Sequence, residues 1–275
     1  MSFADNLFAS LKTVVKLVVE SRPCSVRKGT DGGRLVIMAN GPSLADTIRD
    51  NRALLMSAPS LAVNFAAISP EFKELRPRYY VLADPYFFSD DTSNENLARL
   101  RDELGAVGWK MTLLVPVKYA AKAKRFYPNN DVKTFNIAGL EGFTWLTHPL
   151  YRLGAGMPRP RNVLIPSIML GIALGYTEII ITGADHSWMK TLSVTDENEV
   201  VSIQPHFYSD GDNEKNRVRH EYRNYRLHQI VQSFAIAFKS YHDIEAYARK
   251  RGVHIINATP GSFIDAFDRK LPDSE

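Results

Sequence analysis

Short apolar runs alternate with longer stretches of helical periodicity from residue 34 to the end of the chain. The apolar runs are rich in Val, Ile, Leu and Tyr and do not alternate with polar residues, which is typical of strands buried on both faces. We predict strands at 34–39, 61–64, 79–84, 111–117, 131–137, 178–185 and 253–258.

Helical patterns separate these strands, for example at 94–104, 166–176 and 227–252, and one begins at Leu44. Strands that alternate with helices predict a mostly parallel sheet with helices on both faces. The expected fold is therefore α/β, doubly wound and Rossmann-like, in which ligands bind beyond the carboxyl ends of the strands.

Residues 186–226 interrupt this alternation with a long polar stretch that has no clear periodicity. Long irregular segments inside compact domains are usually functional. Because the stretch follows the strand predicted at 178–185, we interpret it as a lid insertion over the ligand site.

Residues 1–33 precede the α/β region of 34–275 and contain an amphipathic helix followed by a loop. Apolar residues recur at helical spacing beside basic residues: Phe3, Leu7, Leu11, Val14, Val15 and Val18, with Lys12, Lys16, Arg22, Arg27 and Lys28. One interpretation is a helix docked on its own domain or on a second subunit, which would make a homo-oligomer. The alternative is a peripheral contact with a membrane.

Composition restricts the class of protein. Of 275 residues, 45% are hydrophobic and 23% are charged, as in ordinary globular domains. The net charge of +4 suits an anionic ligand, but no Lys/Arg stripe interleaved with aromatics predicts nucleic-acid binding. No apolar run is long enough to span a bilayer. The single cysteine, Cys24, argues against disulfides and favours a cytoplasmic protein.

The segment Asn40-Gly41-Pro42-Ser43 ends the first strand and starts a helix. Glycine permits a tight turn and close approach of a ligand, and we expect Ser43 to cap the helix so that its first N–H groups face the ligand. A simple strand-to-helix connector is the alternative. Neither GxGxxG nor GxxxxGK[ST] is present, which excludes a dinucleotide fingerprint and a Walker loop.

Polar residues end four of the predicted strands: Asn40, Asn64, Asp84 and Asp185. In a parallel sheet these ends lie along one rim, so we expect the four side chains to share a pocket, although each alone is a common helix cap. Arg159 and Arg161 precede the helix at 166–176 and suit a diphosphate or a sugar carboxylate; a solvated basic loop is equally consistent.

The predicted lid supplies candidate bases. A histidine is the usual general base for a hydroxyl nucleophile, and the candidates are His206, beside Phe207 and Tyr208, and three others: His186, His220 and His228. The Asp-Gly-Asp at 210–212 has the composition of a metal-binding turn, but it follows no strand, so we predict no metal site.

Several segments together resemble the bacterial family 42 sialyltransferases. They are "ANGPSL" (39–44), "VNFAAI" (63–68), "YYVLADPYFF" (79–88), "IALGYTEIIITGADHSW" (172–188) and "TPGSFIDAF" (259–267). The same pattern is similar to flagellin-modifying glycosyltransferases and to an archaeal hydroxymethylpterin pyrophosphokinase. The resemblance implies a GT-A-type variant of the Rossmann-like fold.

The resemblance also implies roles for individual residues. Asn40, Ser43 and Asn64 would contact the nucleotide and the donor sugar, Arg161 would match a basic residue before the pocket helix, and Phe207 would cover the donor. The general base would be His206 or His220. The family has a phosphate-binding tyrosine two residues after the strand-ending Asp. This chain has Ser187 there, followed by Trp188, so Tyr208 or an arginine of the lid would take that role.

The predicted function is that of an inverting glycosyltransferase. It would move a sugar, such as a CMP-linked sialic-acid-like sugar, from a nucleotide donor to the hydroxyl of a glycan or lipid-linked glycan, in bacterial surface polysaccharide synthesis at the inner face of the membrane. No metal or cofactor is expected besides the nucleotide sugar. The alternatives are an ATP-dependent pyrophosphokinase, with Mg²⁺ on Asp84, Asp185 and the pair Asp210 and Asp212, or a non-catalytic nucleotide- or glycan-binding module. The predicted donor-site residues are Asn40, Gly41, Ser43, Asn64, Asp84, Arg161, Asp185, Phe207 and Tyr208.

Overall fold

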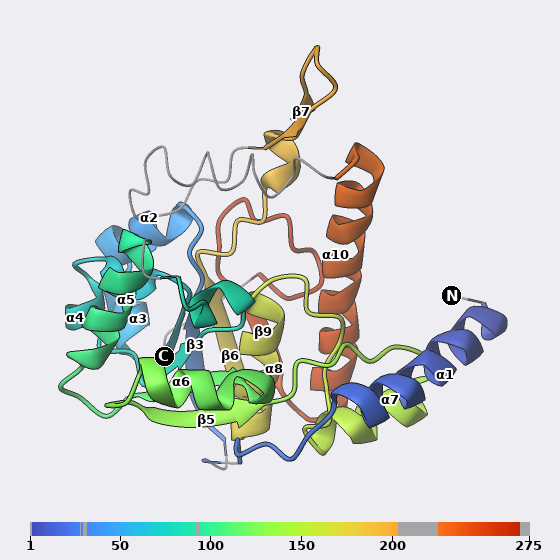
Figure 1. Ribbon diagram of the computed structural model, residues 1–275, viewed down its shortest axis with the longest axis horizontal. Helices are drawn as coiled ribbons and strands as arrows, with labels where there is room; N and C mark the ends of the chain where they lie inside the picture. Colours follow the sequence, from blue (N-terminus) through green and yellow to red (C-terminus); the bar gives the residue numbers. More distant parts are fainter. Residues whose placement is uncertain (1, 28, 30–31, 92–93, 203–224, 270–275) are drawn as a thin grey trace.

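The structure is a computed structural model that describes residues 2–27, 29, 32–91, 94–202 and 225–269. These residues form a parallel seven-stranded sheet, in the order β5-β4-β3-β2-β1-β6-β9 (Figure 1). All seven predicted strands are present: β1 (Arg34–Met38), β2 (Ser60–Val63), β3 (Tyr79–Val81), β4 (Thr112–Pro116), β5 (Asp131–Phe135), β6 (Glu178–Thr182) and β9 (His254–Asn257). All seven end one to three residues earlier than predicted, so that Asn64, Asp84 and Asp185 lie just beyond the sheet.

The order of the strands creates a switch point between β1 and β6. The chain lays β2 to β5 outward on one side of β1, then returns to place β6 and β9 on the other side. Met38 of β1 pairs with Thr182 of β6, so these two strands end at the same level. Connections that leave such a pair in opposite directions open a crevice above the sheet, where doubly wound folds bind their ligands.

Helices cover both faces of the sheet, as expected for a doubly wound fold. One core cluster joins one face to α2 (Ser43–Asp50), α3 (Arg52–Met56), α4 (Phe72–Leu75), α5 (Glu95–Gly105) and α6 (Ala120–Phe126). The other joins the opposite face to α7 (Thr144–Arg152), α8 (Leu164–Leu174) and α10 (Leu227–Lys250). Successive residues of β1 enter the two clusters alternately, with Val36 in one and Ile37 in the other, because side chains alternate across a strand.

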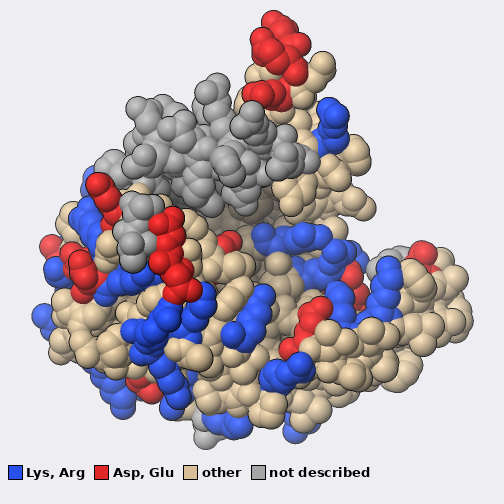
Figure 2. Space-filling view, viewed as in Figure 1, with Lys and Arg blue, Asp and Glu red and all other residues tan. Residues whose placement is uncertain are grey.

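The segment after β6 forms part of the predicted lid. It contains the short helix η4 (Trp188–Lys190) and a hairpin of β7 (Ser193–Val194) and β8 (Val200–Val201). This hairpin stands out from the body with acidic residues at its tip (Figures 1 and 2). The remainder of the predicted lid, from 203 to 224, lies outside the described residues.

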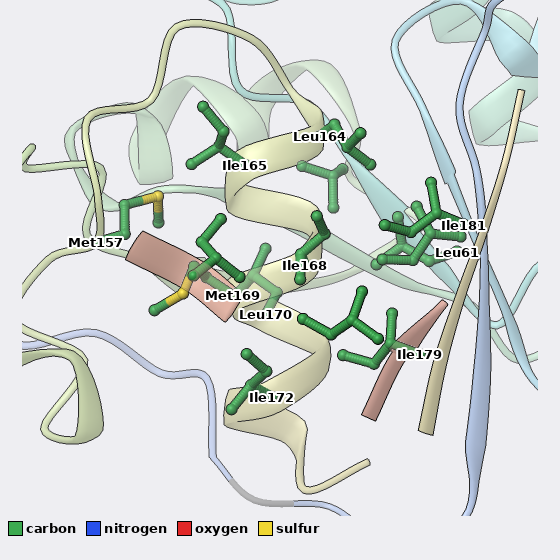
Figure 3. Close-up of a cluster of buried hydrophobic side chains, with 14 of the residues drawn as sticks. Leu61, Met157, Leu164, Ile165, Ile168, Met169, Leu170, Ile172, Ile179 and Ile181 are labelled. Carbon is green, nitrogen blue, oxygen red and sulfur yellow. The ribbon is translucent and has the colours of Figure 1, made fainter. Parts of the chain in front are cut away.

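Helix α8 is apolar all round, and ten of its residues are buried (Figure 3). Its side chains pack between the sheet and α10, with Ile179 and Ile181 of β6 among their neighbours. A fully buried helix of this kind needs no amphipathic pattern. It ends at Gly175, whose φ of 100° favours glycine. The N-terminus of α8 is directed to the switch point, so the rigid core fixes the residues that precede it.

Helix α1 (Phe3–Glu20) docks on the domain through its polar side. It begins in a capping box of Ser2 and Asp5, and Ser10 and Thr13 are its buried residues. The following segment runs beside β5, where the N–H groups of Ser25 and Val26 both donate to the carbonyl oxygen of Thr134 at 3.0 Å. Helix α1 therefore docks on its own domain, which is one of the arrangements expected from the sequence, and it does so through its polar side rather than its apolar stripe. None of the described helices is long and apolar enough to cross a membrane.

Three short helices complete the connections near the strand ends. They are η1 (Ala66–Ile68) after β2, η2 (Pro85–Phe88) after β3 and η3 (Val117–Tyr119) after β4. Because each follows its strand within a few residues, polar residues at the strand ends are held in fixed positions.

Candidate functional site

A cavity of about 560 Å³ opens at the carboxyl ends of β1, β2, β3 and β6. Its wall includes all four strand-ending residues named by the sequence: Asn40, Asn64, Asp84 and Asp185. The structure therefore brings them together on one rim. The volume lies within the range of sites for nucleotides and other small molecules.

Asp185 joins the two strands of the switch point. Its Oδ2 accepts hydrogen bonds from the hydroxyl of Ser43 at 2.8 Å and from the N–H of Ser43 at 3.4 Å. The prediction that Ser43 caps α2 is wrong: Pro42 occupies the N-cap position without a side-chain hydrogen bond. The capping acceptor comes instead from Asp185, in the segment that follows β6, and its negative charge suits the N-terminal end of a helix.

Gly41 is required by this close packing. Its N–H donates to the carbonyl oxygen of Gly183 at 2.7 Å. A Cβ at Gly41 would lie 2.5 Å from the same oxygen and would overlap Asp185 Oδ2. The glycine therefore allows β1 and β6 to approach each other at the cavity floor. Protein atoms fill the space where a Cβ would lie, but Gly41 also lines the cavity, so its contact with a ligand stays a prediction.

Asn40 and Asn64 lie side by side in this wall. The Nδ2 of Asn40 donates to the carbonyl oxygen of Val63 at 3.1 Å, so that this nearly buried amide ties the end of β1 to the end of β2. Asn64 has a φ of 52°, in the left-handed region, and its carbonyl oxygen accepts a hydrogen bond from the hydroxyl of Tyr80 at 2.6 Å. Asn tolerates this conformation better than most residues.

Asp84 combines the two roles that the sequence left open. Its Oδ1 accepts a hydrogen bond from the N–H of Tyr86 at 2.8 Å and so caps η2. Its exposed side chain also lies in the cavity wall. One carboxylate oxygen is thereby used for the cap.

Asn162 is a cavity residue that the sequence reasoning missed. Its Oδ1 accepts hydrogen bonds from the N–H groups of Leu164 at 3.0 Å and Ile165 at 3.3 Å, and from the hydroxyl of Tyr241 at 3.0 Å. These three donors fix which end of the amide is oxygen. Its Nδ2 is buried and has no hydrogen-bond partner among the described residues, a costly arrangement for a donor. An Asn just before a helix is a recognisable cap, and this is the sequence signal that marks Asn162.

His186 continues this network. Its Nε2 lies 2.6 Å from the hydroxyl of Tyr241. Because that hydroxyl donates to Asn162, it accepts from the histidine, which places the proton on Nε2. Burial alone lowers the pKa of His186 to about 3. His186 is therefore neutral near pH 7 and holds the tyrosine in place, and a proton acceptor of this pKa is a poor general base.

Of the residues described, two with positively charged side chains line the cavity. Arg161 is in the cavity wall, as is Lys190 of η4. Burial, followed by repulsion from Arg159, lowers the pKa of the Arg161 guanidinium from its usual high value. Arg159 itself is paired with Glu141 at 3.6 Å. Figure 2 shows Lys and Arg side chains gathered in the hollow between the β7–β8 hairpin and α1.

Aromatic rings form two parts of the wall. Trp188 lies 5.4 Å from Phe234 between ring centroids and 4.2 Å from His186. Across the strand ends, Phe65 lies 6.0 Å from Tyr86. Rings at the edge of a polar cavity provide flat surfaces on which a base or a sugar can stack.

Several predicted residues lie outside the described part of the chain: His206, Phe207, Tyr208, Asp210, Asp212 and His220. His228 is exposed at the start of α10 and does not line the cavity. Within the described ranges, no group of three or more His, Cys, Asp or Glu residues is arranged to hold a metal ion.

Comparison with known proteins gives a likeness in structure. No protein-family model matches the chain, and no curated protein matches it. Among solved structures, it is similar to the MAf glycosyltransferase from Magnetospirillum magneticum AMB-1, with a TM-score of 0.50 and 11% sequence identity. The match covers 98% of this chain and 39% of that protein, so the chain spans well under half of the length of its structural neighbour. A likeness at this identity shows a shared α/β fold. The resemblance to family 42 sialyltransferases receives no support from a family model.

Proposed function

We propose that the chain is a glycosyltransferase that binds a nucleotide sugar in the switch-point cavity. The observation that carries the proposal is the buried Nδ2 of Asn162, a donor without a described partner in the wall of a cavity of nucleotide size. A ligand acceptor would satisfy it. The fold shared with a glycosyltransferase and the resemblance of the strand-end segments support the same class.

The wall offers complementary chemistry to each part of such a donor. Amide groups of Asn64 and Asn162 suit the polar edges of a base or ribose, and the rings of Trp188 and Phe234 suit stacking. Arg161 would neutralise a phosphate or a sugar carboxylate. We infer that the donor is CMP-linked and carries a sialic-acid-like sugar, because the strand-end segments resemble sialyltransferases.

The reaction would be an inverting transfer. The oxygen of an acceptor glycan hydroxyl attacks the anomeric carbon, its proton passes to a lid histidine, and the bond from the anomeric carbon to the phosphate oxygen breaks with its electrons on the departing nucleotide. The candidates for the base are His206 and His220, since burial makes His186 a poor acceptor of protons. We place the reaction in the synthesis of bacterial surface polysaccharides.

Binding measurements test the proposal directly. Calorimetric titration with CMP, UDP, GDP and ATP, each with and without Mg²⁺, should give binding of CMP without metal. Binding of UDP or GDP in its place would refute the CMP-linked donor. Binding that occurs with ATP alone and requires Mg²⁺ would refute the proposal in favour of a pyrophosphokinase. Transfer from the bound nucleotide sugar to a glycan should then fall by orders of magnitude in either His206→Ala or His220→Ala, with donor binding retained.

Substitution of Asn162 tests the observation itself. Asn162→Asp keeps an oxygen for the caps and the tyrosine but removes the Nδ2 donor, so we expect nucleotide affinity to fall about tenfold or more. The buried carboxylate should also lower the melting temperature, so thermal unfolding must show that the variant is folded during the titration. Asn129→Asp is the matched control, because it makes the same charge change at an exposed residue outside the cavity wall. Equal affinities in the two variants would remove Asn162 from the binding site.

A further inference from the structure

The outward surface of α1 is apolar over most of its length. Eight apolar residues are between 47% and 77% exposed: Phe3, Leu7, Phe8, Leu11, Val14, Val15, Val18 and Val19. At 100° per residue they cover an arc of about 160° of the helix. They leave apolar surface on the order of 500 Å², at the upper end of what monomeric proteins leave open.

The direction of this arc is fixed by polar contacts on the opposite side of α1. The hydroxyl of Thr13 donates to the carbonyl oxygen of Glu141 at 2.7 Å and accepts from the N–H of Glu141 at 2.8 Å. Ser10 accepts a hydrogen bond from the N–H of Phe143 at 3.0 Å, and Lys16 donates to the carbonyl oxygen of Gly139 at 2.8 Å. The helix thus turns its polar side inward and its apolar side outward, the reverse of an ordinary surface helix.

A tryptophan extends the apolar surface. Trp145 of α7 is 71% exposed and stacks on Phe143, with 5.9 Å between ring centroids. Phe143 in turn lies 5.4 Å from Phe3 of α1. The surface over α1 and α7, at the lower right of Figure 2, carries few charges. Exposed tryptophan beside an apolar helix is typical of the boundary between lipid and water.

The charge of this region distinguishes between possible partners. The first 28 residues contain five Lys or Arg and two Asp or Glu, and so hold three of the four net positive charges of the chain. A symmetric pair of chains would bring two such regions together, whereas anionic lipid headgroups would neutralise them. An arc of about 160° is also wider than the narrow seam that pairs two helices.

We propose that α1 lies in the interface of an anionic phospholipid membrane, with its apolar arc among the acyl chains and Trp145 at the headgroup level. The contact is peripheral. It does not depend on the reaction proposed for the cavity, because no residue of the arc lines that cavity.

Vesicle flotation of the full chain tests this proposal. We expect it to float with phosphatidylcholine vesicles that contain phosphatidylglycerol, and much less with phosphatidylcholine alone. Leu11→Glu with Val15→Glu, at the centre of the arc, should lower the partition coefficient about 100-fold or more. The matched control is Met56→Glu with Val231→Glu, which makes the same charge change at exposed apolar residues of α3 and α10. It should stay within a few-fold of the unmodified chain.

Two further measurements separate the outcomes. Lipids brominated on the acyl chain should quench tryptophan fluorescence in the unmodified chain and much less in Trp145→Phe. Far-ultraviolet circular dichroism should show both double variants folded, because all four residues are exposed. Equal vesicle binding by the two double variants would overturn the proposal. So would sedimentation showing a dimer that Leu11→Glu with Val15→Glu dissociates, together with no binding to anionic vesicles.

Discussion

His186 should make the stability of this protein depend on pH. Burial lowers its pKa from 6.5 to about 3 in the folded chain. Between these two values the unfolded chain binds a proton that the folded chain does not. The free energy of unfolding therefore falls as pH decreases, by about 1.4 kcal/mol for each pH unit. The contribution of His186 is complete above pH 6.5 and is lost progressively toward pH 3.

The expected loss of unfolding free energy is large enough to measure. From pH 6.5 to pH 5 the loss from this one residue is about 2 kcal/mol, a large part of the 5–15 kcal/mol that typically stabilises a domain. Other titrating groups add their own effects, so the comparison must be with a variant that lacks only the imidazole.

His186→Asn is the appropriate variant. His186 has a φ of 51°, and Asn adopts this left-handed conformation more readily than most residues. The substitution removes the hydrogen bond to Tyr241, which lowers stability equally at every pH, and it removes the titrating group, which changes the slope. Urea unfolding followed by tryptophan fluorescence, between pH 7.5 and 5, should give a curve of stability against pH that is flatter by about 1.4 kcal/mol per unit below pH 6.5.

Tyr241→Phe is the control for the cause of the shift. It removes the hydrogen bond but leaves the imidazole buried, so the slope should remain close to that of the unmodified chain. Parallel curves for His186→Asn and the unmodified chain would refute the argument. Nitrogen chemical shifts showing that the His186 ring takes up a proton near pH 6.5 in the folded protein would refute it independently.

Three other substitutions examine the strand ends. Gly41→Ala should lower the free energy of unfolding by about 1–3 kcal/mol or more, because the new Cβ has no room beside Gly183, as urea unfolding would show; unchanged stability would contradict this packing. Ser43→Ala should lower the free energy of unfolding by about 1–2 kcal/mol, because the Asp185 side chain loses its shortest hydrogen bond. Urea unfolding of Thr47→Ala, on the same helix, is the comparison. Asn64→Ala should be about 1 kcal/mol less stable than Asn64→Gly, measured by thermal unfolding, because glycine adopts a φ of 52° without the strain that alanine has there. The reverse order would argue against that backbone conformation.

The sheet could be predicted from the sequence because its strands are buried on both faces. The central strands are short apolar runs between helical patterns, which predicts a covered parallel sheet. The edge strand β5 alternates instead, with Asp131 and Lys133 exposed. In a parallel sheet the carboxyl ends of the strands lie along one edge. This is why Asn40, Asn64, Asp84 and Asp185 line the same cavity.

The hydrogen-bond partners within the site could not be predicted in the same way. Whether Ser43 caps its own helix or bonds to Asp185 depends on how closely β1 and β6 approach, which periodicity does not encode. The network of His186, Tyr241 and Asn162 joins three distant segments through single atoms. For α1, amphipathic spacing indicated an apolar stripe but not its direction, which two small polar residues decide through backbone hydrogen bonds.

The segment that follows α1 bears on how this protein can be shortened. Ser25 and Val26 hydrogen-bond to Thr134 and so cover the edge strand β5. At the other edge, the carbonyl oxygen of Asp268 accepts from the N–H of Asn257 in β9. Uncovered edge strands can pair with strands of other molecules. We therefore expect a chain truncated to begin at residue 34 to aggregate, because it lacks Ser25 and Val26. A chain that begins after Glu20 would lack the apolar helix α1 but keep the segment that covers the edge of the sheet.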